Sequence, residues 1–115
     1  FKSSVVVYSN DMKSKLLNIP NDLIAKNGAV SEIVAFNMAK NSLKILKADL
    51  SIAVTGIAGP TGGSIDKPVG LVWVAIGTNQ KIISNKYQFI GNRLEVRLKT
   101  TYESLKLANK VISKI

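Results

Sequence analysis

The segment VTGIAGPTGGSIDKPVG, residues 54–70, constrains the fold of this chain more than any other. It holds five of the eight glycines and lies between two apolar runs, LSIAV and LVWVAIG. Glycine loses more backbone entropy on folding than any other residue, so an ordered loop of this composition is costly. The apolar runs predict buried strands, and the segment predicts a long loop between them at one end of a sheet.

Length and composition predict one globular domain, residues 1–115. The 46% hydrophobic content is ordinary, and a chain of this size can build one core. The apolar run around residues 68–77 is too short to cross a bilayer, so we expect no membrane association. The absence of cysteine is compatible with a reducing cytoplasm, where we expect the protein. The chain begins with Phe rather than Met, which leaves room for an upstream segment.

The residue types present limit the available chemistry. There is no cysteine and no histidine, which excludes thiolate nucleophiles, histidine bases and nearly all zinc sites. The acidic residues are scattered, so we expect neither a metal site nor a cofactor. Any catalysis must rely on Ser, Thr, Tyr, Lys, Asp, Glu or Arg.

The charge is strongly basic, with 16 Lys and Arg against 7 Asp and Glu, a net charge of +9. Only two of the basic residues are arginine, the residue that nucleic-acid readers favour for base edges and phosphates. There is one Trp and few other aromatic residues to stack on bases. The pattern favours lysines that solvate helix surfaces, and a nucleic-acid-binding module is the weaker alternative.

The order of strands and helices predicts an α/β fold. We expect strands at about residues 4–8, 50–55, 70–76 and 81–90, and helices at about 9–17, 20–28, 31–47 and 92–115. Strands separated by helices pair in parallel and a hairpin pairs antiparallel, so the pattern favours a mixed sheet with helices on both faces.

The last helix carries a regular apolar seam. Leu residues and small or β-branched residues recur at alternating spacings of four and three: Leu94, Leu98, Thr101, Leu105, Ala108, Ile112 and Ile115. This seam is expected to face the core.

Two segments leave strand ends and would meet at one edge of a parallel sheet, namely residues 8–13 and the loop 55–70. Backbone N–H groups in the loop could approach an anion closely, which makes the glycines candidate ligand-binding residues: Gly56, Gly59, Gly62 and Gly63. The alternative is that the loop is only a structural connection. It fits neither a P-loop nor a dinucleotide fingerprint.

Lys13 and Tyr8 are the candidate catalytic residues. Lys13 lies in the first turn of its predicted helix, where the dipole disfavours a cation and lowers a lysine pKa, more so in a dry site. A neutral lysine is a competent general base, and Tyr8 could relay a proton or orient it. The alternative is that Lys13 is solvated and Tyr8 fills the core.

Five stretches follow one another along the chain: YSNDMK (8–13), GAVSE (28–32), AVTGIAGPTGG (53–63), KPVGLVWVAI (67–76) and FIGNRLEVR (89–97). Together they resemble the CinA C-terminal domain family, the competence- and damage-inducible, nicotinamide-nucleotide amidohydrolase (PncC-type) family. The resemblance runs from Phe1 to the C-terminus. It implies a three-layer α/β/α sandwich with a mixed sheet. It also implies that the protein forms a homo-oligomer, namely a dimer.

The resemblance also implies an activity. The family resembles serine amidohydrolases with a Ser-Lys-Tyr arrangement that act on nicotinamide mononucleotide, releasing ammonia in pyridine nucleotide salvage. Tyr8 and Lys13 match the tyrosine and lysine, and Thr55 matches a threonine of the loop. Either Arg93 or Arg97 matches an arginine near the substrate, where a guanidinium would suit a phosphate.

The chain departs from the family pattern at its beginning. The family's proposed nucleophilic serine matches a position just upstream of Phe1, so the domain is expected to be N-terminally incomplete. Ser3 and Ser4 occupy positions where the family usually has small residues, and we interpret them as strand residues. The alternative to an amidohydrolase is a non-catalytic domain of this family that acts through ligand binding or dimerisation.

Overall fold

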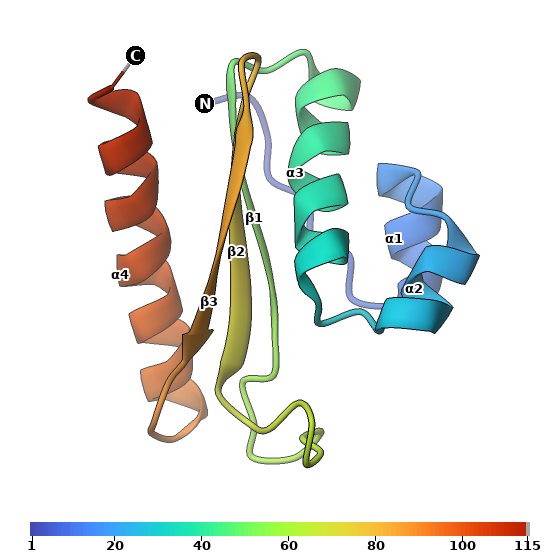
Figure 1. The fold of residues 1–115 in the computed structure, drawn as a ribbon, viewed down its shortest axis with the longest axis vertical. Helices are drawn as coiled ribbons and strands as arrows, with labels where there is room; N and C mark the ends of the chain where they lie inside the picture. Colours follow the sequence, from blue (N-terminus) through green and yellow to red (C-terminus); the bar gives the residue numbers. More distant parts are fainter. Residues whose placement is uncertain (115) are drawn as a thin grey trace.

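The protein forms three layers (Figure 1). The structure is a computed structural model and describes residues 1–114. The helix α3 (Glu32–Leu46) covers one face of the sheet, and α1 (Asn10–Leu17) and α2 (Asn21–Asn27) pack against α3 rather than against the strands. The single long helix α4 (Arg93–Ile112) covers the other face. This arrangement confirms the predicted three-layer α/β/α sandwich.

The sheet has the strand order β1-β2-β3, with β1 at Leu50–Gly56, β2 at Leu71–Thr78 and β3 at Ile82–Gln88. Both pairs are antiparallel, with Val54 opposite Val74 and Val74 opposite Asn85. The predicted mixed sheet therefore lacks its parallel pair among the described residues. That pair depended on the first predicted strand.

The predicted strand at residues 4–8 is wrong. The segment has no ladder hydrogen bonds and runs separately toward α1, in the same downward direction as β1 (Figure 1). Only Val7 is buried in it, while Val6 and Tyr8 are exposed. An apolar run becomes a strand only where a neighbour satisfies its backbone groups. No described strand pairs with this segment, and Val7 is the one residue of 4–8 that packs in the core.

The helix ends follow the sequence signals. Ser9 and Ser31 accept hydrogen bonds from Met12 and Val34 N–H, which caps α1 and α3. Asn92 and Glu95 form a complete capping box at the start of α4. Within residues 1–114, none of the helices combines the length and the apolarity needed to cross a membrane.

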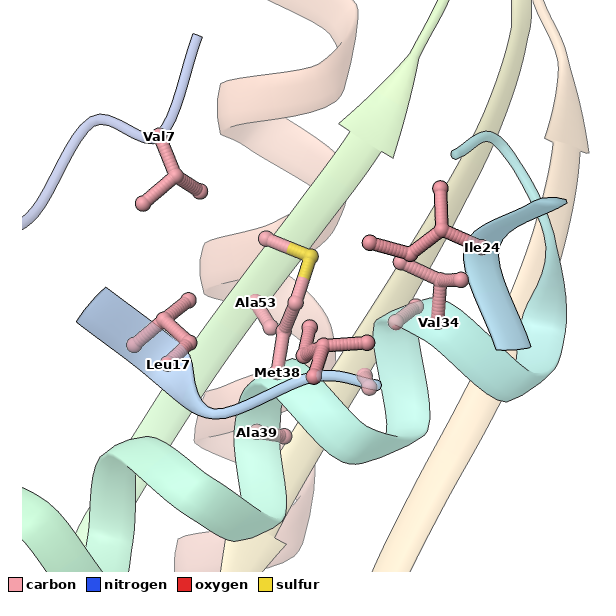
Figure 2. Close-up of a cluster of buried hydrophobic side chains, with 10 residues drawn as sticks. Val7, Leu17, Ile24, Val34, Met38, Ala39 and Ala53 are labelled. Carbon is pink, nitrogen blue, oxygen red and sulfur yellow. The ribbon is translucent and has the colours of Figure 1, made fainter. Parts of the chain in front are cut away.

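Each face of the sheet has its own core. Figure 2 shows the cluster on the α1–α3 side, in which Val7, Leu17 and Met38 approach Ala53 of β1. On the α4 side, Val74 and Ile76 of β2 pack with Val96, Leu107 and neighbouring residues. Successive residues of β2 serve opposite faces because strand side chains alternate.

The apolar seam predicted for α4 does not face the core. The residues of α4 that are buried are Val96, Ser104, Leu107, Ala108 and Val111. Of the predicted seam only Ala108 is among them; Leu94, Leu98, Thr101, Leu105 and Ile112 are exposed, and Ile115 lies outside the described residues. The helix has two apolar faces: the leucine-rich face gave the stronger periodic signal, but the face with Val96, Leu107, Ala108 and Val111 is the one that packs on the sheet.

Candidate functional site

The glycine-rich loop projects from the end of the sheet where β1 stops and β2 begins (Figure 1). Backbone hydrogen bonds close its base: Ile57 N–H donates to the Leu71 carbonyl (2.9 Å), and Gly70 N–H donates to the Ile57 carbonyl (2.7 Å). Phe89 N–H, just after β3, donates to the Gly70 carbonyl at 2.9 Å. The base of the loop is therefore an extension of the sheet. The residues between Ala58 and Val69 extend beyond the sheet, and we call them the free part of the loop because they take no part in its strand pairing.

Two cationic side chains tie the loop to both helical layers. Lys67 Nζ donates to the carbonyl of Asn27, the last residue of α2. Arg93 Nη1, from the first turn of α4, donates to the Gly59 carbonyl at 2.9 Å. Hydrogen bonds from charged donors are stronger than neutral ones, so these contacts fix the loop between the layers. Lys67 was not among the predicted site residues. Its position inside the glycine-rich loop is the sequence signal that could have indicated a role in fixing the loop.

The loop glycines differ in what surrounds them. At Gly56, Gly59 and Gly63 a side chain would strike Val72 or Val69, so these three make room for the packing of the loop on itself. At Gly62 the nearest atom to an added Cβ is 3.7 Å away, and the residue is exposed. Gly62 is thus the predicted anion-binding glycine whose backbone a ligand can approach freely.

Lys13 is a buried titratable group at the start of α1. It is the fourth residue of α1, it is only 7% exposed, and its Nζ donates to the Val7 carbonyl at 3.0 Å. Burial disfavours the charged ammonium, which lowers the pKa of Lys13 below the ordinary lysine value. A lowered pKa makes the unprotonated amine, which can accept a proton, easier to form, so this position suits proton transfer.

Tyr8 and Thr55 have contrasting environments. Tyr8 is 88% exposed, so its phenol does not fill the core. Thr55 is buried near the end of β1, and its Oγ1 donates to the Ala29 carbonyl at 2.8 Å. Ala29 lies in the turn between α2 and α3, two residues after Asn27, so Thr55 and Lys67 bind neighbouring carbonyls at the end of α2 and the start of this turn.

Lys13 and Thr55 lie on the same side of the sheet. Val7, which accepts the Lys13 hydrogen bond, packs in one cluster with Ala53, and Ala53 and Thr55 share a face of β1. Arg93 reaches the loop from the opposite layer, and Arg97 follows one turn further along α4, exposed. Two surface hollows of the described chain lie beside α4 and beside the β2–β3 hairpin, and neither is lined by Lys13, Thr55 or Arg93.

These features define a class of protein: an α/β/α domain with a fixed glycine-rich loop, cationic anchors and a desolvated lysine at a helix start. The chain belongs to the CinA C-terminal domain family, whose model matches residues 1–112. A CinA-like protein of Prochlorococcus marinus is 52% identical over 101 residues. A CinA-like protein of Endomicrobium trichonymphae is 44% identical over 115 residues.

Solved structures of the same superfamily share the fold. A CinA superfamily protein from Klebsiella pneumoniae has a TM-score of 0.90 at 27% identity, covering 95% of this chain and 68% of that one. A competence/damage-inducible protein from Agrobacterium tumefaciens has a TM-score of 0.84 at 37% identity, covering 87% and 62%.

The relatives are longer than this chain. The match covers 87% of this chain and 24% of the Prochlorococcus protein, and 99% of this chain and 27% of the Endomicrobium protein. The chain therefore spans about a quarter of those relatives, and about two thirds of the solved chains.

Proposed function

We propose that this domain binds a pyridine mononucleotide and supplies the general base of an amidohydrolase that converts the carboxamide of nicotinamide mononucleotide to the acid, releasing ammonia. The observation that carries the proposal is Lys13, a buried amine with a lowered pKa on the same side of the sheet as Thr55. A lysine buried without a carboxylate partner is costly to a fold, and perturbed groups of this kind concentrate at functional sites.

The nucleophile comes from outside the described residues. The serines nearest Lys13 in sequence are occupied: Ser9 caps α1, and Ser14 Oγ donates to the Ile19 carbonyl at 2.6 Å. Ser3 and Ser4 are exposed in the segment before α1. We assign the attacking hydroxyl to a serine of an additional segment of the native polypeptide.

The chemistry follows from these groups. Neutral Lys13 takes the serine proton as the serine oxygen attacks the carboxamide carbon. Backbone N–H donors stabilise the oxyanion, and the tetrahedral intermediate collapses as lysine returns its proton to the departing ammonia. Water then attacks the acyl ester, lysine accepts one of its protons, and the carboxylic acid leaves as the serine regains its hydrogen.

The phosphate of the ligand is assigned to the free part of the loop. The Gly62 backbone is open to approach, and the Arg93 guanidinium already lies at the Gly59 carbonyl in the same loop. Arg93 therefore fits the predicted substrate arginine better than Arg97, because it reaches the loop. A guanidinium bound to one carbonyl retains further N–H donors for a phosphate.

Two measurements test the proposal. Calorimetric titration of nicotinamide mononucleotide into this chain should show binding, and the native polypeptide, with any segment that precedes residue 1 in its gene, should release ammonia. Lys13→Met should abolish ammonia release while leaving binding within about twofold, because a base acts in the chemical step. The matched control is Lys15→Met, an exposed lysine of the same helix paired with Asp11, which should change neither. Absence of binding would refute the proposal.

A non-catalytic ligand-binding domain is the second candidate. It is favoured by the hydrogen bonds already made by Lys13 Nζ and Thr55 Oγ1 to backbone carbonyls, which give both groups a structural role. This candidate predicts that the native polypeptide binds the mononucleotide but releases no ammonia.

A further inference from the structure

A surface hollow lies at the end of the sheet opposite the glycine-rich loop. It is formed between α3 and the turn that joins β2 to β3, and we call it the hairpin hollow. Figure 1 shows this turn at the top of the view and the glycine-rich loop at the bottom. The hairpin hollow has a volume of about 480 Å³, and small-molecule sites measure roughly 300–1,000 Å³. Its size therefore suits a ligand as large as a nucleotide.

Three lysines from two elements line the hairpin hollow: Lys40 and Lys44 of α3, and Lys81 at the end of the β2–β3 turn. All three are exposed, and none of the residues that line the hollow is Asp or Glu. Within residues 1–114 the ion pair that forms joins Lys15 to Asp11, so these three ammonium groups have no carboxylate partner there. Like charges around one hollow create a positive potential that attracts anions.

The helix dipole accounts for one of these lysines and not for the others. Lys44 lies in the last turn of α3, where a cation is favoured. Lys40 lies one turn earlier, and like charges four residues apart destabilise a helix. Lys81 comes from the turn, which is fixed by hydrogen bonds from Gln80 and Lys81 N–H to Thr78 Oγ1, both 3.3 Å. The fold thus holds a third cation beside two that repel each other, an arrangement that a bound anion would stabilise.

The floor of the hairpin hollow is apolar. Phe36, Lys40 and Leu43 recur at spacings of four and three, so they lie on one side of α3. Ile82 of β3 lines the hollow with them. Phe36 and Ile82 are half-buried, so part of each remains open to a ligand, and an aromatic ring is a stacking surface for a base. The hollow therefore combines positive charge with a surface that suits a flat ring.

We propose that the hairpin hollow binds a nucleoside polyphosphate, with its base on Phe36 and its phosphates at Lys40, Lys44 and Lys81. A polyphosphate chain carries more negative charge than the single phosphate of a mononucleotide, so it matches three ammonium groups better. Lysine binds phosphate as a point charge and needs no fixed planar geometry, which suits long side chains at a surface. This site and the one proposed for the pyridine mononucleotide lie at opposite ends of the sheet, so either proposal can fail alone.

The test is calorimetric titration of ATP, without added metal ions, into the chain at about 50 mM NaCl. We expect one site with a dissociation constant of about 100 µM, weakened at least about fivefold at about 500 mM NaCl. Lys40→Gln and Lys44→Gln should each weaken ATP binding about three- to tenfold, because each removes one ammonium contact. The matched control is Lys110→Gln, which makes the same charge change at an exposed position of α4 and should leave binding within about twofold.

Phe36→Leu separates the contribution of the base from that of the phosphates. It should weaken ATP binding at least about fivefold and leave binding of inorganic triphosphate within about twofold, because only the base stacks on the ring. Circular dichroism checks that each variant is folded. Without ligand, Lys40→Gln should not lower the melting temperature, because it removes a like-charge repulsion.

Four results would overturn the proposal. They are the absence of ATP binding, ATP binding that both lysine variants leave unchanged, inorganic triphosphate bound by the wild type as tightly as ATP, and single-stranded RNA bound through the same lysines more tightly than ATP. A lower melting temperature of Lys40→Gln would show that this lysine serves the fold, and would equally contradict it. Nicotinamide mononucleotide at the same concentration as ATP should not displace it, and none of these outcomes depends on Lys13.

Discussion

Gly70 closes the base of the glycine-rich loop, and replacing it with alanine tests whether that base is rigid. Its φ is +92°, which an L side chain resists at a cost of roughly 1–2 kcal/mol. An added Cβ would also overlap the Phe89 carbonyl oxygen, a backbone atom that cannot rotate away. Relief of this overlap must strain the hydrogen bond from Phe89 N–H to Gly70, a further cost of about 1–3 kcal/mol. We expect Gly70→Ala to lower the free energy of unfolding by roughly 2–5 kcal/mol, the sum of the two costs.

Gly62→Ala is the matched control because it shares the backbone constraint without the overlap. Its φ is +95°, and the nearest atom to an added Cβ is 3.7 Å away. Gly62→Ala should therefore lose only about 1–2 kcal/mol. Urea unfolding followed by the fluorescence of Trp73, the single tryptophan, measures both, and the melting temperatures should differ by roughly 10 °C. Equal losses of unfolding free energy in the two variants would show that the backbone at the loop base shifts to accommodate the added Cβ, and would refute the reasoning.

Three further predictions concern single side chains. Folding lowers the Lys13 pKa, so between the folded value and the unfolded value of 10.5 the unfolded chain binds more protons than the folded chain. The stability of the wild type relative to Lys13→Met should therefore rise with pH up to about 10.5. A difference that does not change with pH in urea titrations would contradict this. Ser104 Oγ is buried without a partner among the described residues, so Ser104→Ala should stabilise the protein by about 1 kcal/mol in thermal unfolding; destabilisation would reveal an overlooked partner. Lys67→Met should cost about 1 kcal/mol or less yet accelerate amide exchange at residues 58–69, and unchanged exchange would show that the Asn27 contact does not hold the loop.

Local signals in the sequence located the helices and the loop well. Ser9, Ser31 and Asn92 begin helices because their side chains satisfy free N–H groups nearby, which is a short-range effect. The loop between β1 and β2 follows in the same way from its glycines. Whether residues 4–8 form a strand depends instead on a pairing partner, and a local pattern carries no information about that partner.

The orientation of α4 and the contacts of the site depend on long-range packing. The predicted seam and the buried set of Val96, Ser104, Leu107 and Val111 are both compatible with a helix, and only the packing above β2 selects the buried set. The low pKa of Lys13 was predicted from its place in a helix start, and the structure supplies its burial as the cause. The carbonyl partners of Lys67 and Arg93 belong to the backbone of distant residues, which no side-chain pattern identifies.

The central claim, that a pyridine mononucleotide binds between the start of α1 and the glycine-rich loop, is tested most directly by amide chemical shifts. Nicotinamide mononucleotide should be titrated into the ¹⁵N-labelled chain. The account predicts saturable shifts at Tyr8 and Lys13 together with Thr55 and Gly62, and little change along α4 beyond its first turns. No saturable shifts, or shifts confined to α4 beyond its first turns, would contradict it.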